Sequence, residues 1–433
     1  MGDAKTLVLG GGMSGLAAGM ASGFPVLEAT ASPGGICSSY YVRPSTTQRL
    51  RHAPDDGGAY RFEIGGGHWI FGGDPAIVRF IRSLGEVRAY ERASSVFFPD
   101  TGQYVPYPLQ NHLGHLERPV AVKALAEMAR PQGSCRTMEE WLRGSFGETL
   151  CDLFFFPFHD LYTAGMHREI APQDPYKSPA SLGIAIKGAF EKAPPVGYNV
   201  SYLYPVEGLD TVARKMAERG EVRYGKRVTV IDVRKKTVAC EDGTEAKYER
   251  LISTLPLVTM VDLCGLQLDE RSDPYTSVLV LNLGARRGAR CPDDHWIYVP
   301  RSRSGFHRVG FYSNVDRCFL PKASRADGGR VSVYVERACR GGRRPPPAEV
   351  EIYTRSTVDE LRDWGFIEEA EVADPTFIDV AYTWSWPDSR FRIKALKALE
   401  EQGIYQVGRY GRWVFQGIAD SIRDGFYVGQ ALR

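Results

Sequence analysis

Three glycines near the N-terminus have the spacing to bind a dinucleotide. Gly10, Gly12 and Gly15 form a G-x-G-x-x-G pattern directly after the apolar run of residues 5–9. Between a strand and a helix, the first glycine permits a tight turn, the second lets a pyrophosphate approach the backbone, and the third lets the helix pack on the strand. The helix, with Ser14 in its first turn, would direct its N–H groups and positive dipole end at the diphosphate.

An acid follows where a dinucleotide-binding fold needs one. Glu28 ends a second apolar run, FPVLEA, and a carboxylate there can accept hydrogen bonds from both ribose hydroxyls. A glycine pattern alone gives weak support, because Gly-rich turns are common, but here the strand, the helix and the acid agree. The opening of the chain therefore predicts a dinucleotide-binding domain.

Two later stretches combine residue types that ordinary core segments do not. GGGHWIFGGDP covers residues 65–75, and VPYPLQNHL covers residues 105–113. A histidine, a phenol and side-chain amides in loop-like segments can hold a ligand. A proline-rich turn packed on the core would give the same pattern, so this interpretation stays open.

The overall composition limits the classes of partner. With 433 residues, 43% hydrophobic and 24% charged, the chain has room for two or three domains with a sizeable core. A formal net charge of +2 argues against binding nucleic acid or a membrane surface through bulk charge. A small-molecule partner is the expectation.

Cysteine spacing and hydropathy indicate the compartment. The eight cysteines are scattered, with no C-x-x-C pair and no metal-ligand spacing, which is typical of reduced thiols rather than of a disulfide scaffold or a metal site. No apolar run approaches the roughly 18 residues of a membrane span, and a strand expected within five residues of the start leaves no room for a signal peptide. We expect a cytoplasmic protein without a metal.

The segments around these motifs resemble the FAD-binding fold of the amine oxidase, protoporphyrinogen oxidase and UDP-galactopyranose mutase superfamily. The resemblance rests on ATASPGGICSSY after Glu28, YRFEIGGGHWIF, the hairpin segment from residue 226 to STLP, and the terminal GRYGRWVFQGIADSIRDG. It implies FAD as the cofactor. The further cofactor-binding residues that it implies are Gly34, Gly35, Gly66, Gly67, Val228, Gly408, Arg409, Ala419, Ser421 and Ile422.

Within the superfamily the chain is most similar to the UDP-galactopyranose mutases, especially the longer eukaryotic type. The fragments GGGHWIF, VPYPLQNHL, FFFPFHDLYTAGM, YNVSYLYPVEGLD, WIYVPRSRSGFHRVGFYSN and GRYGRWVF match in order along nearly the whole chain. In that family N5 of the reduced flavin is the nucleophile toward the anomeric carbon of a nucleotide sugar. NAD(P)H or another reductant is the expected electron source.

The mutase resemblance assigns roles residue by residue. It places His68 beside the flavin, Arg308 and Arg409 at the diphosphate, and these three are the expected catalytic residues. A planar guanidinium suits a diphosphate because it makes paired, charge-assisted hydrogen bonds. The expected substrate-binding residues are Phe71, Tyr107, Gln110, His159, Asn199, Tyr298, Arg308, Trp386 and Phe415.

Several positions depart from the mutase pattern. An asparagine and a tryptophan expected within PFHDLYT are His159 and Thr163. Two expected diphosphate-binding tyrosines are Trp386 and Phe415, which keep a ring and lose a phenol. Losing two hydrogen bonds to a charged group would weaken binding by about 1.5–3 kcal/mol each. The terminal GIADSIRDG also resembles the amine oxidases more than the mutases.

Three functions therefore stay open. The first is a mutase that interconverts pyranose and furanose forms of a nucleotide sugar, or a variant of it. The second is an FAD-dependent oxidase or desaturase that transfers a hydride to the flavin. The third is a flavin-binding protein without turnover, against which the retained arginines argue.

The expected architecture is α/β, with α+β character overall. An FAD-binding Rossmann-like domain would comprise residues 1–75, 205–265 and 400–433. A helical insert would cover residues 112–190, with Thr137 as a helix N-cap. An antiparallel, sheet-rich substrate domain would span residues 76–111 and 266–399, with strands in SVLVLNLGA, HRVGFYS and RVSVYVERA.

Overall fold

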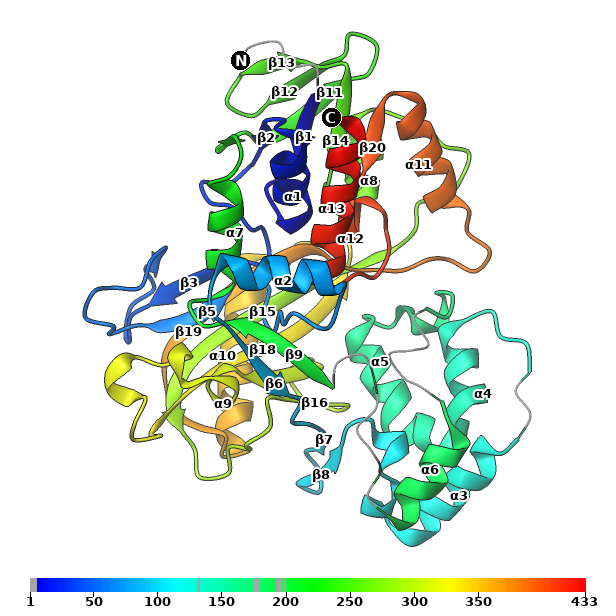
Figure 1. Cartoon of the computed structure of the whole chain (residues 1–433). Coiled ribbons are helices and arrows are strands. Elements are labelled where there is room, and N and C mark those ends of the chain that lie inside the picture. The colour runs from blue at the N-terminus through cyan, green and yellow to red at the C-terminus, as the bar shows by residue number, and fades with distance from the viewer. Residues whose placement is uncertain (1–5, 131–132, 174–179, 192, 194–196, 198–199) are drawn as a thin grey trace.

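The computed structural model describes the chain except for residues 1–5, 131–132, 174–179, 192, 194–196 and 198–199. Figure 1 shows a lobe that contains the C-terminus, a large sheet next to it, and a group of helices beside that sheet. The α/β fold class predicted from the sequence is confirmed.

The first lobe rests on a five-stranded parallel sheet in the order β10–β2–β1–β14–β20. Its strands are β1 (Thr6–Leu9), β2 (Val26–Leu27), β10 (Val222–Arg223), β14 (Arg250–Ser253) and β20 (Ile404–Gln406). Both faces are covered by helices, which explains why β1 is buried at every position and apolar from Leu7 to Leu9.

Alternate side chains of β1 enter two different layers. Val8 packs with α1 (Met13–Ser22) and α13 (Ile418–Leu432). Leu7 and Leu9 pack with α8 (Leu257–Leu263) and α11 (Phe391–Glu401) on the opposite face. This period of two is what a buried strand requires.

A seven-stranded sheet forms the second part, in the order β19–β15–β18–β17–β16–β7–β8. Its strands are β7 (Ser94–Phe98), β8 (Gln103–Pro106), β15 (Tyr275–Arg287), β16 (Trp296–Tyr298), β17 (Arg308–Phe311), β18 (Arg330–Arg340) and β19 (Ile367–Thr383). All pairs are antiparallel except β16 with β7. Helix α10 (Pro347–Asp363) packs on one face, and the other face joins the central core.

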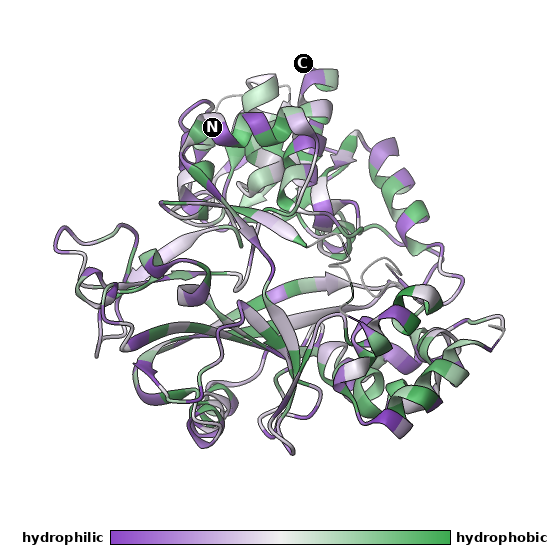
Figure 2. Cartoon of the chain, turned by 60° about the horizontal axis from the view of Figure 1, so that its bottom comes forward, coloured by the Kyte–Doolittle hydropathy of each residue, from purple (hydrophilic) through white to green (hydrophobic). Residues whose placement is uncertain are grey.

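The third part is a group of helices with its own apolar core. It contains α3 (Arg118–Met128), α4 (Met138–Leu150), the π-helix η3 (Cys151–Phe155), α5 (Phe156–Tyr162) and α6 (Leu182–Phe190). Thr137 caps α4 as predicted: its Oγ1 accepts from the Glu140 N–H at 3.3 Å, and the Glu140 carboxylate accepts from the Thr137 N–H at 3.1 Å. Figure 2 shows hydrophobic and hydrophilic residues on the same helices here, as expected of amphipathic surface helices.

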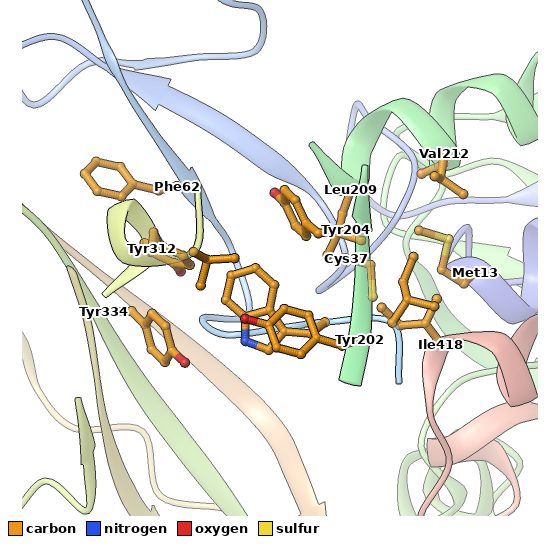
Figure 3. Packing of buried hydrophobic residues seen from close by; sticks show 14 of the residues in the cluster. Met13, Cys37, Phe62, Tyr202, Tyr204, Leu209, Val212, Tyr312, Tyr334 and Ile418 are labelled. Carbon is orange, nitrogen blue, oxygen red and sulfur yellow. The ribbon is translucent and has the colours of Figure 1, made fainter. Parts of the chain in front are cut away.

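Smaller elements connect the three parts. The strands are β3 (Ser39–Val42), β4 (Arg49–Leu50), β5 (Tyr60–Glu63), β6 (Val87–Glu91), β9 (Ser201–Pro205), β11 (Val228–Asp232), β12 (Thr237–Cys240) and β13 (Glu245–Lys247). The helices are α2 (Pro75–Leu84), α7 (Leu209–Ala217), α9 (Tyr312–Val315) and α12 (Gly408–Gly411). The central core joins the lobe to the large sheet, and Figure 3 shows Tyr202, Tyr312 and Tyr334 within it.

Two helices lie on the other side of the domain boundaries that the sequence suggested. The predicted sheet-rich segment starts at residue 76, yet α2 packs on the first lobe, where Phe80 contacts Phe426 of α13 with 5.0 Å between ring centres. The predicted lobe resumes at residue 400, yet α11 already packs there, with Phe391 and Leu399 in the core that also holds Leu251. Both helices are amphipathic connectors, and sequence pattern alone does not say which sheet their apolar face meets.

Within the described residues, no helix combines the length and hydropathy needed to cross a membrane. The same part of the chain holds no group of three or more His, Cys, Asp or Glu placed to bind a metal ion.

Candidate active site

Two adjoining cavities lie between the three parts of the molecule. The first, about 560 Å³, is lined by Gly10 to Ser14 and Glu28 and is called here the dinucleotide cavity. The second, about 530 Å³, lies between the large sheet and the helical group and is called the aromatic cavity after Phe155, Phe158 and Tyr162 in its wall. The residues that line both include His68, Arg409, Gly417 and Ile418.

The glycine turn has the shape of a cradle for a phosphate group. Gly10 has φ 97°, and a Cβ on Gly15 would lie 1.9 Å from the Gly10 carbonyl oxygen, so α1 packs directly on the turn. A Cβ on Gly12 would meet no atom within 4 Å, because that side faces the cavity. Gly12 caps α1 without any side-chain hydrogen bond to the first N–H groups. This terminus suits an anion.

Glu28 lies beside this turn, at the end of β2. Its Oε2 accepts from the Gly11 N–H at 2.7 Å, and its Oε1 accepts from the N–H and the hydroxyl of Thr30, both at 2.7 Å. These bonds fix the carboxylate, which is 6% exposed and lines the cavity. Each oxygen keeps further acceptor capacity for a hydroxyl donor.

The other predicted cofactor residues divide into those that line the dinucleotide cavity and those that support it. Ser14, Gly34, Gly35, Val228, Arg409 and Ser421 line it. Ala419 and Ile422 are 1% and 0% exposed and pack in the core, whereas Gly417 and Ile418 at the start of α13 face both cavities. Gly408 has φ 75°, and a Cβ there would lie 2.2 Å from Ser14 Oγ.

The glycine loop after β5 carries His68 to the junction of the cavities. A Cβ on Gly66 would lie 2.9 Å from the Glu336 carboxylate, and one on Gly67 would lie 2.0 Å from the Tyr334 hydroxyl, so the loop passes against both. Burial and the nearby arginines lower the pKa of His68 to about 4 although Glu336 raises it. The ring is therefore neutral near pH 7, and its Nδ1 has no protein partner among the described residues.

Arg409 stands at the same junction, in α12. Its guanidinium carbon lies 4.7 Å from the ring centre of Phe415 and 5.6 Å from that of Tyr382. Its Nη1 and Nη2 donate to the carbonyls of Gln416 and Ala381 at 3.4 Å. The aromatic rings hold the cation where both cavities meet.

Arg308 is paired with a carboxylate that the sequence analysis did not identify. Its Nη2 donates to both oxygens of Glu336 at 2.6 Å, and its Nε donates to Oε2 at 3.1 Å. Burial raises the pKa of Glu336, but Arg308 and His307 together outweigh this effect and lower it to about 2. The signal in the sequence is the single acid within the apolar strand RVSVYVERA, two positions after Tyr334 and on the same face.

His307 adjoins this pair and also lines the aromatic cavity. The ring is 1% exposed, and its Nε2 lies 3.6 Å from Glu336 Oε2. Neither ring nitrogen makes a hydrogen bond with a described residue. The sequence analysis missed His307, since only its neighbour Arg308 matches the mutase pattern.

The assignment of Trp386 as a substrate-binding residue disagrees with its position. Trp386 does not line the aromatic cavity: its Nε1 donates to the Ser272 carbonyl at 2.9 Å, and the Arg271 guanidinium lies 3.6 Å from its ring centre. Tyr382, four residues earlier, lines the cavity with its hydroxyl 3.4 Å from Arg308 Nη2. The cavity therefore has a phenol beside Arg308, that of Tyr382, although the sequence analysis expected none near Trp386.

The remaining predicted substrate residues are partly brought together. Phe71, Tyr107, His159, Tyr298 and Phe415 line the aromatic cavity, and the rings of Tyr107 and Tyr298 lie 4.5 Å apart. Gln110 is 1% exposed and outside the cavity lining. Asn199 lies outside the described residues.

The sequence matches the family model of flavin-containing amine oxidoreductases over residues 16–392. The chain belongs to this family. Its members bind a flavin, and the glycine cradle with Glu28 fits the adenosine diphosphate part of FAD. The protein is therefore a flavin-dependent enzyme of the amine oxidase superfamily.

Solved structures of this superfamily share the fold. A reduced UDP-galactopyranose mutase aligns with a TM-score of 0.82 at 19% identity, over 99% of this chain and 95% of that one. A putative protoporphyrinogen oxidase from Exiguobacterium sp. 255-15 gives 0.70 at 14% identity, over 100% and 99%. A putrescine oxidase variant gives 0.55 at 14% identity, over 99% and 98%. At these identities the likeness concerns the fold alone.

Proposed function

We propose that this amine oxidase family member is a mutase that interconverts pyranose and furanose forms of a sugar attached to a nucleoside diphosphate. The observation that carries the proposal is the meeting of the two cavities at His68 and Arg409, with Arg308 in the wall of the second. A ligand phosphate held by these arginines would place a sugar next to the cofactor site.

The FAD would be held along the dinucleotide cavity. Gly10, Gly12 and the start of α1 would receive its diphosphate, Glu28 its ribose hydroxyls, and Val228 would lie near the adenine. The start of α13, at Gly417 and Ile418, would face the flavin ring with its positive dipole end. Reduced FAD supplies a nucleophilic nitrogen for the anomeric carbon, and NAD(P)H is a suitable reductant.

The protein's own groups would bind and orient the diphosphate. Arg308 keeps its Nη1 without a bond to any described residue, and its Nη2 lies beside the Tyr382 hydroxyl. Arg409 would reach the ligand from the flavin side. Two cations and a phenol from three separate elements can thus hold one diphosphate, which orients the sugar for reaction.

Water exclusion is the second contribution of the protein. Phe158 and Tyr162 of the helical group, Tyr298 of the large sheet and Trp384 just after β19 line the aromatic cavity. These rings would shield a reactive sugar species from hydrolysis. The neutral His68 would stand at the junction without adding charge.

The test uses FAD-loaded protein with UDP-galactopyranose and UDP-galactofuranose, with and without dithionite. Chromatography should show interconversion only after reduction, with no net consumption of reductant per turnover. Failure to convert any of a panel of nucleotide sugars, with the flavin fully reduced, would overturn the proposal.

One observation favours a second candidate, an FAD-dependent oxidase or desaturase. The charged residues that line the aromatic cavity are two arginines, Arg308 and Arg409, and two acids, Glu336 and Asp420, so their formal charges cancel. Such a cavity also suits an apolar substrate. An oxidase would bleach its flavin on anaerobic addition of substrate and release hydrogen peroxide in air, whereas a mutase would do neither.

A further inference from the structure

One side of the helical segment η3–α5 forms a wall of the aromatic cavity. Phe155, Phe158, His159 and Tyr162 line it. Phe158 and His159 each lie three or four residues from Phe155 and from Tyr162, which places all four on one broad helical face. Phe158 and Tyr162 are stacked, with 5.5 Å between ring centres and an angle of 20°. His159 is the one imidazole in this row, and the other three side chains are those of two phenylalanines and a tyrosine.

The hydrogen bond of His159 fixes its tautomer. Nδ1 lies 2.7 Å from the carbonyl oxygen of Phe155. A carbonyl can only accept, so Nδ1 carries the proton. Burial lowers the pKa of His159 to about 4, so the ring is neutral near pH 7 and Nε2 is a lone-pair acceptor.

Nε2 is the atom that His159 offers to the cavity. The two ring nitrogens point in diverging directions, and Nδ1 is turned to its own helix. Nε2 makes no hydrogen bond with a residue in the described part of the chain, and His159, 8% exposed as a whole residue, lines the cavity. This lone pair can accept a donor from cavity water or, when a ligand displaces that water, from the ligand.

The position of His159 relative to the arginine indicates which part of a ligand reaches it. The ring of Tyr162 lies between, with its centre 6.0 Å from that of His159 and 5.3 Å from that of His307, the neighbour of Arg308. A nucleoside diphosphate with its phosphates at Arg308 would extend its base along this row of rings.

We propose that His159 selects the base of the nucleotide: its Nε2 accepts the ring N–H of an imide base, such as N3–H of uracil, while the aromatic row contacts the flat face. This inference rests on the proposed function, because it takes a nucleoside diphosphate as the ligand. An imide base offers the donor at its edge, and alkylation of that nitrogen removes it.

The test compares UDP with 3-methyl-UDP, in which N3 carries a methyl group in place of the hydrogen, by calorimetric titration of the FAD-loaded protein. The wild type should bind UDP at least about tenfold more tightly. In His159→Leu the two affinities should become equal within about threefold, whereas His159→Gln, whose amide oxygen can accept, should keep most of the preference. FAD content and thermal melting check that each variant is folded.

Equal affinity of the wild type for both ligands would overturn the inference and leave the proposed function intact. A preference that persists in His159→Leu would show that the methyl group is rejected by its size, and it would also overturn the inference. Absence of binding of either ligand to FAD-loaded wild type would overturn the proposed function together with it. Equal affinities of the wild type overturn the inference even if a variant does not fold.

Discussion

Arg308 on β17 and Glu336 on β18 face each other across an antiparallel pair and form an ion pair with two oxygens and two nitrogens in contact. Glu336 is 2% exposed, and among the described residues its carboxylate is paired with Arg308 and lies near His307. The carboxylate fixes the direction of the guanidinium, and it also reduces the net positive charge that a diphosphate would meet.

Arg308→Lys should weaken nucleotide binding without unfolding the protein. Lysine keeps the charge that Glu336 needs, but its single ammonium cannot reproduce the planar fork. UDP affinity should fall about tenfold or more with FAD content unchanged. Titration calorimetry measures the effect, and Arg303→Lys is the matched control, because Arg303 pairs with Asp363 at the surface with a 68% exposed side chain. An Arg308→Lys protein with unchanged UDP affinity would refute the diphosphate role.

The replacement of the same arginine by alanine tests the ion pair itself. Arg308→Ala leaves Glu336 buried and unpaired, which should destabilise the fold by about 3–5 kcal/mol in denaturant titrations. Arg308→Lys should lose much less free energy of unfolding, because its ammonium still pairs with Glu336.

Tyr382→Phe and Trp386→Phe should separate the corrected assignment from the predicted one. Tyr382 places its hydroxyl 3.4 Å from Arg308 Nη2 inside the cavity, whereas Trp386 bonds the Ser272 carbonyl outside it. Loss of the phenol should lower UDP affinity about threefold to tenfold. The tryptophan variant should bind UDP like the wild type; the reverse order of effects would restore Trp386 as the ligand-binding residue.

Local motifs made part of this site predictable. The glycine pattern, the strand before it, the helix after it and Glu28 lie within 28 residues, so their joint geometry follows from one strand–turn–helix unit. Pairs such as Arg308 and Glu336 depend on the register of two strands separated by a long connection, which the sequence pattern does not specify. The same holds for Tyr382, which the register of β19 places beside β15 and within reach of β17.

Gly12→Val should weaken FAD binding strongly while sparing the fold. Gly12 has φ −74° and ψ 176°, which any residue can adopt, and an added Cβ meets nothing within 4 Å on its cavity side. The valine side chain would occupy the space for the diphosphate. The purified variant should be colourless, with FAD affinity lowered roughly a hundredfold. Gly183→Val is the matched control, because a Cβ there also meets nothing within 4 Å; a yellow Gly12→Val protein would contradict the cradle.

Glu63→Gln should change how stability depends on pH. Burial raises the pKa of Glu63 from 4.5 to about 7, although Tyr204 and Arg61 act against it. Between pH 4.5 and 7 the folded state therefore keeps a proton on Glu63 that the unfolded state releases. The contribution of Glu63 to the free energy of unfolding is complete below pH 4.5 and is lost as the pH rises through 7. Glutamine stays neutral at every pH. The free energy of unfolding of the variant minus that of the wild type should therefore be about 3 kcal/mol larger near pH 8 than at pH 4.5. If the melting temperatures of the wild type and of Glu63→Gln change with pH in the same way, the raised pKa of Glu63 is contradicted.

Two expectations from composition and resemblance stay predictions: the cytoplasmic location and the identity of the electron donor. Neither follows from the arrangement of side chains. Gln110 shows a related limit, because its loop matches the mutase pattern while its side chain is buried outside the cavity lining. A sequence match fixes which loop approaches a site, whereas local packing fixes which side chains enter it.

The most direct test of the account is the absorption spectrum of the bound flavin during titration with UDP. The account predicts a saturable change, because the nucleotide would bind beside the junction that His68 and Arg409 share with the flavin. The midpoint should shift to higher UDP concentration in Arg308→Lys. A flavin spectrum that stays unchanged up to millimolar UDP, together with bleaching by an amine or a polyene, would contradict the account.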